Sequence, residues 1–181
     1  MEMKGKAKRF AEKAHAGQYR KTGNIPYITH PIRVAALLES SGASDELVCA
    51  GYLHDVVEDT TIGIDEIEKE FGERVADLVR SHTEDKSKTW KERKQHTIDI
   101  LKTAEPEVKQ LIIADRLDNL LSLEADLQRI GPDVWNVFNA GYEDQKWYNM
   151  ELLKHMDDGL PEKERPKFFD DFSAVIQRIF H

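Results

Sequence analysis

Residues 53–60 read Leu53-His54-Asp55-Val56-Val57-Glu58-Asp59-Thr60 and continue an apolar run, residues 47–53, that is typical of a helix. One histidine and three carboxylates therefore lie beside apolar packing, where unpaired charges are costly. At helical spacing His54 and Glu58 share a face, as do Asp55 and Glu58. Imidazole and carboxylate together suit a divalent transition metal such as Mn²⁺, Fe²⁺ or Zn²⁺. We therefore expect a metal site here, completed by ligands from elsewhere in the chain.

The composition is that of an ordinary globular protein. The chain has 181 residues, of which 40% are hydrophobic and 33% charged, and this fits one domain with a substantial core. No apolar run approaches the ~20 residues of a membrane span, and the N-terminus shows no signal-peptide pattern. Cys49 lies in an apolar run, so we expect a buried thiol and a cytoplasmic protein. The net charge of −8 argues against a nucleic-acid polymer as partner.

Helical periodicity dominates the chain, and strand signals are scarce. We predict an all-α fold of about eight to ten helices in a single domain over residues 1–181, with core motifs in residues 15–150. The C-terminal helices, residues 160–181, would pack on this core. A polar loop with glycine and proline, residues 18–28, would accommodate a short β-hairpin. Predicted helices cover residues 2–15, 31–41, 45–55, 65–71, 73–82, 89–103, 106–130, 132–153 and 166–180. Ser44 or Asp45 is the expected cap of the helix over residues 45–55, and Thr89 with Glu92 is the expected capping box of the helix over residues 89–103.

Two further residues are candidates to complete the metal site. His30 lies at the mouth of a helix that a proline opens, and Asp115 interrupts the most apolar helix. With His54 and Asp55 they supply two imidazoles and two carboxylates, which leaves positions on a six-coordinate metal for water and a substrate oxygen. Each residue alone has a plainer interpretation. A helical histidine usually packs, and an aspartate in an apolar helix usually caps or pairs with an arginine such as Arg116.

Three blocks of sequence in a fixed order carry a family resemblance. They are Tyr27-Ile28-Thr29-His30-Pro31, residues 53–60, and Ala114-Asp115-Arg116-Leu117-Asp118-Asn119. Together with residues 14–23 and 83–86, they resemble the HD-domain hydrolases of the RelA/SpoT superfamily in their free-standing form, the small alarmone hydrolases. The similarity extends over roughly residues 5–150. No Gly-Tyr-Pro follows the His-Asp pair, which disfavours the cyclic-di-GMP phosphodiesterase branch.

The resemblance implies a helical fold, one Mn²⁺ per chain (or another divalent transition metal), and alarmone degradation in the stringent response. The reaction would convert ppGpp or pppGpp to GDP or GTP and pyrophosphate. The implied metal ligands are His30, His54, Asp55 and Asp115. Glu58 and Asp59 would activate or orient the attacking water, and Asn119 would hold substrate or metal-bound solvent. We take Glu58 as the general base, the alternative being that it orients His54 from outside the metal shell.

Substrate phosphates need cationic or hydrogen-bonding partners. Arg20 and Lys21 match the family's substrate-binding loop by position, and Lys88 belongs to a basic island within residues 86–94. The alternative for this island is a solvated helix face. Asn119, Ser122 and Tyr148 are the remaining expected substrate contacts. Tyr148 could equally be a core aromatic.

The chain also departs from the family pattern. Ile112 and Leu121 stand where lysine and arginine are frequent in the family, Asp118 replaces a commonly neutral or histidine residue, and Asp144 stands where some relatives use a basic residue. These changes do not alter the proposed metal ligands, but they remove positive charges, so the sequence does not decide which nucleotide the protein prefers. A broader HD phosphohydrolase acting on ppApp, NADPH or a dNTP is therefore one alternative. A catalytically idle alarmone-binding domain is another.

The expected partner is a small nucleotide, with no membrane and no nucleic-acid polymer, and the protein is expected to be a monomer or homodimer. The remaining histidines and the tryptophans show no partner pattern, and we interpret them as structural or surface residues: His15, His82, His96, His155, His181, Trp90, Trp135 and Trp147.

Overall fold

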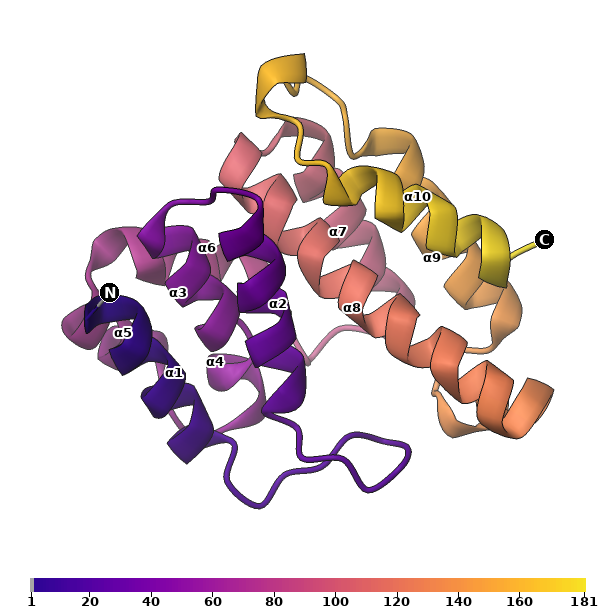
Figure 1. The fold of residues 1–181 in the computed structure, drawn as a ribbon, viewed down its shortest axis with the longest axis horizontal. Coiled ribbons are helices and arrows are strands. Elements are labelled where there is room, and N and C mark those ends of the chain that lie inside the picture. The colour runs from indigo at the N-terminus through magenta and orange to yellow at the C-terminus, as the bar shows by residue number, and fades with distance from the viewer. Residues whose placement is uncertain (1) are drawn as a thin grey trace. The chain divides into compact units, whose positions relative to one another are not determined.

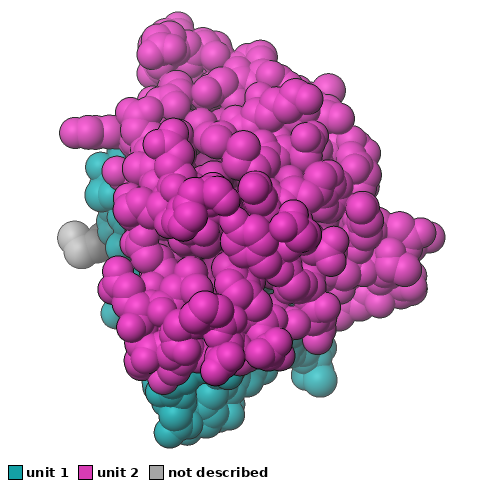
Figure 2. Space-filling view, turned by 90° about the vertical axis from the view of Figure 1, so that its right-hand side faces the viewer, with its two compact units in different colours: residues 1–84 teal, residues 85–181 magenta. Residues whose placement is uncertain are grey.

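The structure, a computed structural model, describes residues 2–181, and within that range the regular elements are all helices (Figure 1). The all-α prediction is thus confirmed. The chain divides into two compact units, the first ending at Glu84 and the second covering Asp85–His181 (Figure 2). A single functional domain over residues 1–181 stays a prediction. In the described part of the chain, no helix is long and apolar enough to cross a membrane.

The first unit is built around one short central helix, α3, which contacts α1, α2 and α6. Ser44, one of the two residues predicted to cap this helix, begins it, because its hydroxyl accepts a hydrogen bond from the Leu47 amide at 3.1 Å. Cys49 is fully buried in it, and burial raises the pKa of its thiol to about 11. The helices of this unit are α1 (Glu2–Ala14), α2 (Thr29–Ser40), α3 (Asp45–Leu53), α4 (Val56–Asp59), α5 (Ile64–Phe71) and α6 (Glu73–His82).

The absence of a side chain at Gly51 lets α2 and α3 approach closely. A Cβ atom at Gly51 would lie 2.9 Å from Leu38 Cδ1 and 3.1 Å from the Ala35 Cα. Such distances are too short for a side chain, so only glycine fits without displacing α2. On α3, Gly51 lies three residues before His54, which follows the end of this helix. On α2, Ala35 lies about one and a half turns after His30. The close packing therefore brings the two histidine-bearing segments together.

The helix predicted over residues 45–55 is shorter than expected. It ends at Leu53, and His54 and Asp55 form the turn between α3 and α4. Asp55 has φ −102° and ψ −3°, which is compatible with a turn before the single helical turn of α4. His54 and Glu58 are therefore not on one continuous helix, and their proximity depends on this turn rather than on helical spacing alone.

The loop over residues 18–28 has the hydrogen bonds of a minimal hairpin. The Arg20 amide donates to the Ile25 carbonyl at 2.8 Å, and the Tyr27 amide donates to the Gln18 carbonyl at 2.9 Å. Only one antiparallel bridge results, between Tyr19 and residue 26, so no strand forms among the described residues. The loop ends beside His30 and fixes how the chain enters α2.

The second unit is organised around its longest helix, α8, which contacts α7, α10 and a 3₁₀ segment, η1. The predicted capping box at the start of α7 is present. The Glu92 amide donates to Thr89 Oγ1 at 3.2 Å, and the Thr89 amide donates to Glu92 Oε2 at 2.8 Å. The elements are α7 (Trp90–Thr103), α8 (Pro106–Ile130), η1 (Gly131–Val137), α9 (Tyr142–His155), η2 (Glu162–Glu164) and α10 (Phe168–Ile179).

The long helix predicted over residues 132–153 is wrong in its first part. Residues 131–137 form the 3₁₀ segment η1, and α9 begins only at Tyr142. Asn139 and Gly141 are weak helix formers, and Gly141 is extended with φ −78° and ψ −173°. Trp135 consequently lies outside α9, where it packs against Tyr142 and Phe180.

Candidate metal centre

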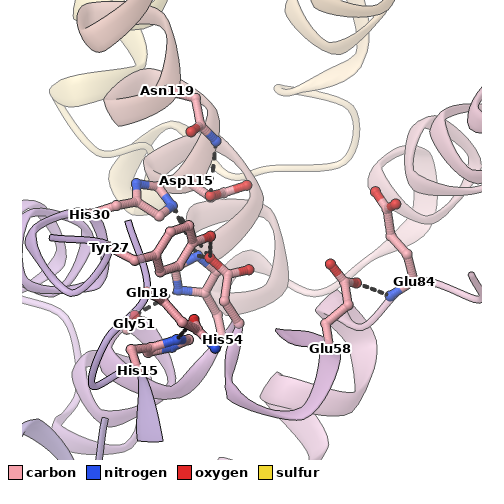
Figure 3. Close-up of polar contacts among 11 residues, drawn as sticks. His15, Gln18, Tyr27, His30, Gly51, His54, Glu58, Glu84, Asp115 and Asn119 are labelled. Carbon is pink, nitrogen blue, oxygen red and sulfur yellow. Dashed lines mark hydrogen bonds and ion pairs between the residues drawn. The ribbon is translucent and has the colours of Figure 1, made fainter. Parts of the chain in front are cut away.

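Two buried histidines face each other in the first unit. His30 comes from the first turn of α2, and His54 follows the last residue of α3. Each is 1% exposed. Their Nε2 atoms lie 3.2 Å apart and their ring centroids 5.1 Å apart (Figure 3). The two imidazole rings therefore direct their Nε2 atoms toward each other.

The tautomer of His54 follows from its other nitrogen. Nδ1 lies 2.7 Å from the carbonyl oxygen of Gly51, which can only accept a hydrogen bond. In a neutral ring, Nδ1 must then carry the proton, and Nε2 presents a lone pair. That lone pair is directed at His30 Nε2. Backbone orientation of a ligating imidazole in this way is typical of metal sites.

Asp55 places a third electron-pair donor at the same point. Its Oδ2 atom lies 3.0 Å from His54 Nε2 and 3.6 Å from His30 Nε2. Potential ligand atoms of these three residues all lie within 4.8 Å of one another. Electron-rich atoms that converge in a buried place need a proton or a cation between them. Two imidazole nitrogens and a carboxylate oxygen fit a divalent transition metal.

Glu58 and Asp59 extend the acidic side of the centre. One carboxylate oxygen from each of Asp55, Glu58 and Asp59 lies within 4.8 Å of the others. The Glu84 amide donates to Glu58 Oε1 at 2.6 Å, which fixes the side chain (Figure 3). Burial raises the pKa of Glu58, the Glu84 amide opposes this rise, and the neighbouring carboxylates add to it. Glu58 is therefore a more basic carboxylate than one in water.

Several residues that were not predicted to contact this centre support it. The Tyr27 hydroxyl donates to Asp55 Oδ2 at 2.6 Å. Gln18 donates through Nε2 to the Asp59 carbonyl at 2.9 Å, and its Oε1 lies 2.8 Å from His15 Nδ1. His15 is buried, as a structural role requires. Tyr27 lies three residues before His30 in the first motif block, and that position is the one signal that pointed to it.

His82 was also interpreted as having no partner pattern, but it packs against the centre. It is the last residue of α6, and its ring centroid lies 5.1 Å from that of His54 at an interplanar angle of 83°. No local spacing in the sequence indicates this, because the two residues lie far apart in the chain, one in the turn after α3 and the other at the end of α6. Packing of α6 on α3 brings them together.

The other predicted ligand, Asp115, belongs to the second unit. It lies half-buried on α8, one turn before Asn119, whose Nδ2 donates to Asp115 Oδ1 at 3.2 Å. The plainer interpretation, an ion pair with Arg116, does not apply. Arg116 instead lies over the Tyr148 ring at 5.3 Å and donates to Asn149 Oδ1 at 3.5 Å. Neighbouring residues on a helix point in different directions, which explains this separation.

The predicted substrate residues have different environments. In the first unit, Arg20 is half-buried with its guanidinium 5.6 Å from the Tyr27 ring, and Lys21 is exposed at the loop. In the second unit, Lys88 is exposed in the turn before α7, and Ser122 is half-buried on α8. Tyr148 is 3% exposed on α9, so its ring is packed on most sides.

Comparison with known proteins identifies similar sequences. A family model described as HD domain matches residues 7–143. A human protein named guanosine-3′,5′-bis(diphosphate) 3′-pyrophosphohydrolase MESH1 is 40% identical over 130 residues, which cover 70% of each chain. A Synechocystis protein named probable guanosine-3′,5′-bis(diphosphate) 3′-pyrophosphohydrolase is 38% identical over 122 residues, which cover 64% of this chain. That match spans only 16% of the Synechocystis protein.

A solved structure supports the fold independently. The crystal structure of a Listeria monocytogenes protein has 47% sequence identity and a TM-score of 0.80, and the match covers 83% of this chain and 98% of that one. The arrangement of helices is thus shared with a protein of similar sequence.

Proposed function

The chain belongs to the HD-domain family, and on that premise we propose that it is a metal-dependent hydrolase of the 3′-pyrophosphate of ppGpp and pppGpp. The observation that carries the proposal is the convergence of His30 Nε2, His54 Nε2 and Asp55 Oδ2 in a buried place. The names of the human and Synechocystis relatives support the substrate. Degradation of alarmones in the stringent response would be the consequence.

The proposed cofactor is one Mn²⁺ per chain, held by His30, His54 and Asp55. Asp115 is proposed as the fourth ligand, which the family resemblance supports and which its hydrogen bond with Asn119 would orient. Mixed nitrogen and oxygen ligation suits Mn²⁺ and also other divalent transition metals. When bound, the ion would polarise a phosphoryl oxygen and lower the pKa of coordinated water.

Glu58 is proposed as the general base. A water oxygen forms a bond to the phosphorus next to the 3′-oxygen, and the bond from that phosphorus to the 3′-oxygen breaks. Glu58 takes a proton from the water, and the released 3′-oxygen gains a proton, so that the products are GDP and pyrophosphate. Its raised pKa supports this role, because a base works best when its pKa is close to the working pH. Asp59 would orient the same water.

The proposed substrate contacts are polar side chains on both units. Arg20 and Lys21 of the first unit would bind phosphates, and Asn119, Ser122 and Lys88 of the second would bind other polar groups of the nucleotide. The cation–π contact of Arg20 with Tyr27 supports its placement, because Tyr27 also holds Asp55. Tyr148, whose ring is nearly enclosed, would contribute by packing behind such contacts.

A broader nucleotide hydrolase is the alternative that one observation favours. Ile112 is 2% exposed and Leu121 is 41% exposed, at positions where the family resemblance leads us to expect lysine and arginine. The cations that would select a particular nucleotide are therefore missing there. We further propose that the protein binds a small molecule, is a monomer or a homodimer, and is located in the cytoplasm.

A substrate panel tests the proposal directly. Purified protein loaded with Mn²⁺ would be assayed against ppGpp, pppGpp, ppApp, NADPH and dNTPs, with and without chelator. We expect release of pyrophosphate from ppGpp and pppGpp, abolished by the chelator. Cleavage of NADPH or a dNTP with ppGpp left intact would favour the broader hydrolase. Tight ppGpp binding without turnover of any substrate would favour an idle binding domain.

A further inference from the structure

The helix that carries Glu58 and Asp59 is only one turn long. α4 covers Val56–Asp59, and a helix of this length is not stable by itself, because nucleating a helical turn costs more than its few hydrogen bonds return. One of these bonds joins the Asp59 amide to the Asp55 carbonyl at 3.0 Å. Contacts from other parts of the first unit must therefore hold α4 in place.

The base of the loop over residues 18–28 contacts both ends of α4. The Tyr27 hydroxyl donates to Asp55 Oδ2 at 2.6 Å, directly before the helix. Gln18 Nε2 donates to the carbonyl of Asp59, the last residue of the helix, at 2.9 Å. A backbone hydrogen bond from the Tyr27 amide to the Gln18 carbonyl, at 2.9 Å, joins the two residues. We call Gln18 and Tyr27 the α4 clamp, because together they fix the start and the end of this turn.

His15 determines which way the Gln18 amide faces. The Asp59 carbonyl can only accept a hydrogen bond, so Gln18 must present its NH₂ group to that carbonyl and its Oε1 atom to the opposite side. There Oε1 lies 2.8 Å from Nδ1 of His15, which must then carry a proton (Figure 3). A reversed amide would place its NH₂ group against this N–H and its oxygen against the Asp59 carbonyl. His15 therefore selects the one amide orientation that can hold Asp59.

The other nitrogen of His15 indicates that this residue does more than fill space. His15 is 2% exposed, and its Nε2 atom is buried without a hydrogen-bond partner among the described residues. With the proton on Nδ1, Nε2 of a neutral ring is an acceptor, and an unpartnered buried acceptor destabilises the fold. The ring also packs against Tyr27, with the two centroids 5.0 Å apart, but an apolar side chain would make that contact without this cost. The bond of Nδ1 to Gln18 is the contact that needs an imidazole.

We propose that His15 is a positioning residue of the hydrolase, acting through the α4 clamp to hold Glu58 and Asp59 at the attacking water. The inference rests on the proposed function, in which Glu58 takes a proton from that water. Gln18 holds the end of α4, while the Glu84 amide holds Glu58 Oε1 at 2.6 Å. The path from His15 runs through the Gln18 amide to a backbone carbonyl, not to a proposed metal ligand. Its loss should therefore displace the base without releasing the ion.

Steady-state kinetics with ppGpp at saturating Mn²⁺ test this role. His15→Leu keeps a side chain of similar size against Tyr27 but removes the Nδ1 donor. We expect kcat to fall about tenfold or more with KM and Mn²⁺ affinity unchanged, because the base is displaced while the contacts that bind the substrate remain. His15→Asn keeps an NH₂ group near the place of Nδ1 and should recover most of the loss. His96→Leu, which changes an exposed histidine on α7, is the matched control and should behave like the unchanged protein.

Gln18→Met tests the next step of the same path. Methionine keeps the length of the side chain and removes both amide groups, so the hydrogen bond to the Asp59 carbonyl is lost. We expect kcat to fall about tenfold or more at unchanged Mn²⁺ affinity. Combining His15→Leu with Gln18→Met should add little further loss, because both changes break one path. Gln95→Met, which changes an exposed glutamine paired with Asp99, is the matched control and should turn over ppGpp normally.

Nuclear magnetic resonance of the metal-free protein tests the clamp without any turnover. The ¹⁵N spectrum of the His15 ring should show the proton on Nδ1, as its bond to Gln18 requires. Hydrogen exchange of the Asp59 amide, which bonds to the Asp55 carbonyl, should be about threefold faster or more in His15→Leu, because a lost hydrogen bond frees the end of α4. Amides inside α3 should exchange at an unchanged rate.

Unchanged kcat in correctly folded His15→Leu and Gln18→Met proteins, or a loss that excess Mn²⁺ recovers, overturns the inference while the proposed function stands. A His15 ring with its proton on Nε2 overturns it as well. If the unchanged protein hydrolyses no nucleotide of the panel, the proposed function fails by itself. Amide exchange then decides on the clamp: faster exchange of Asp59 in His15→Leu upholds it, and an unchanged rate removes it.

Discussion

The buried histidine pair and the α4 clamp hold different parts of the first unit. His30 and His54 are 1% exposed, and a backbone carbonyl fixes the ring of His54. Gln18 is half-buried, and its side chain donates to the backbone of Asp59. The histidine pair is therefore directed at a single point, whereas the clamp fixes the short helix that carries Glu58.

This difference implies different responses to mutation. A metal centre needs each of its few ligands in place, so the loss of one ligand removes the ion and with it the activity. A clamp of several hydrogen bonds holds its helix through partial contacts, and the loss of one bond leaves the others in place. Mutations of the proposed metal ligands should thus change activity far more than mutations of the clamp.

The largest effect is expected for His54→Ala. The change removes the Nε2 donor that lies 3.0 Å from Asp55 Oδ2 and leaves that carboxylate without its nearest imidazole. We expect loss of bound Mn²⁺ and of pyrophosphate release to background, measured by metal analysis and a phosphate assay. His96→Ala, an exposed histidine on α7, is the control and should keep both. Full activity in a metal-free His54→Ala protein would remove the metal from the mechanism.

Glu58→Gln should separate metal binding from turnover. The amide oxygen of glutamine can still accept the hydrogen bond from the Glu84 amide, but the side chain can no longer take a proton. We expect metal content to be unchanged and turnover to fall about 10²–10⁴-fold, as for the loss of a general base. In the unchanged protein, turnover should fall as the pH drops through the raised pKa of Glu58. An active Glu58→Gln enzyme would leave Glu58 an orienting role only.

The same Glu58→Gln variant should be more stable at neutral pH. Burial raises the folded-state pKa of Glu58, so the stability that this group adds is complete below the ordinary pKa of glutamate and is lost as the pH rises through the folded value. A neutral glutamine avoids this loss. In chelator, we expect the Tm of Glu58→Gln to exceed that of the unchanged protein at pH 7.5, and the difference to be smaller near pH 4. For a chain of this length, a change of 1 kcal/mol in stability shifts the Tm by about 2–4 °C.

Gly51→Ala tests the close approach of α2 and α3. The added methyl group would lie 2.9 Å from Leu38 Cδ1 and 3.1 Å from the Ala35 backbone, so one helix must shift. We expect a loss of about 1–3 kcal/mol in the free energy of unfolding, measured by urea denaturation, together with weaker Mn²⁺ binding. Gly63→Ala is the control, because no atom lies within 4 Å of its added Cβ. Equal stability of the two variants would show that the helices adjust freely.

Much of the fold follows from local sequence signals. Ser44 at the start of α3 and the Thr89–Glu92 capping box are placed correctly, because caps depend on residues three apart.

Helix ends are harder to predict. His54 and Asp55 were expected inside a helix but form a turn. Residues 132–141 were expected to be α-helical, but η1 ends at Val137 and α9 begins only at Tyr142. The weak helix formers Asn139 and Gly141 are a local signal for the second difference. No comparable local signal marks the end of α3 at Leu53.

Some residues of the candidate site could be predicted from the sequence, and others could not. The motif blocks identified His30, His54 and Asp55, which the first unit brings together. The role of Asp115 stays a prediction. His82 could not be found from sequence, because helix packing alone brings it to His54. Tyr27 lies within a motif block, yet nothing in its spacing shows that its hydroxyl reaches a carboxylate 28 positions away.

Tyr27→Phe should have the smallest effect of these changes in the first unit. It removes the hydroxyl that donates to Asp55 Oδ2 at 2.6 Å and keeps the ring beside His15, His30 and Arg20. Asp55 should then be less well oriented, and we expect Mn²⁺ affinity to fall about tenfold, as when an outer partner of a metal ligand is lost. Equilibrium titration with Mn²⁺ measures this effect directly.

The result also bears on the contrast between the two regions. If Tyr27 acts by orienting Asp55, saturating Mn²⁺ should restore most of the turnover of Tyr27→Phe, and KM should change little. If the ring acts mainly by supporting Arg20, turnover should stay low at saturating Mn²⁺ or KM should rise, and the orienting role would be wrong. Tyr19→Phe is the matched control, because Tyr19 is 58% exposed on the same loop and should change neither quantity. A tenfold loss recovered by added metal would show that the Tyr27 end of the clamp acts through the metal, whereas the loss in Gln18→Met should show no such dependence on metal.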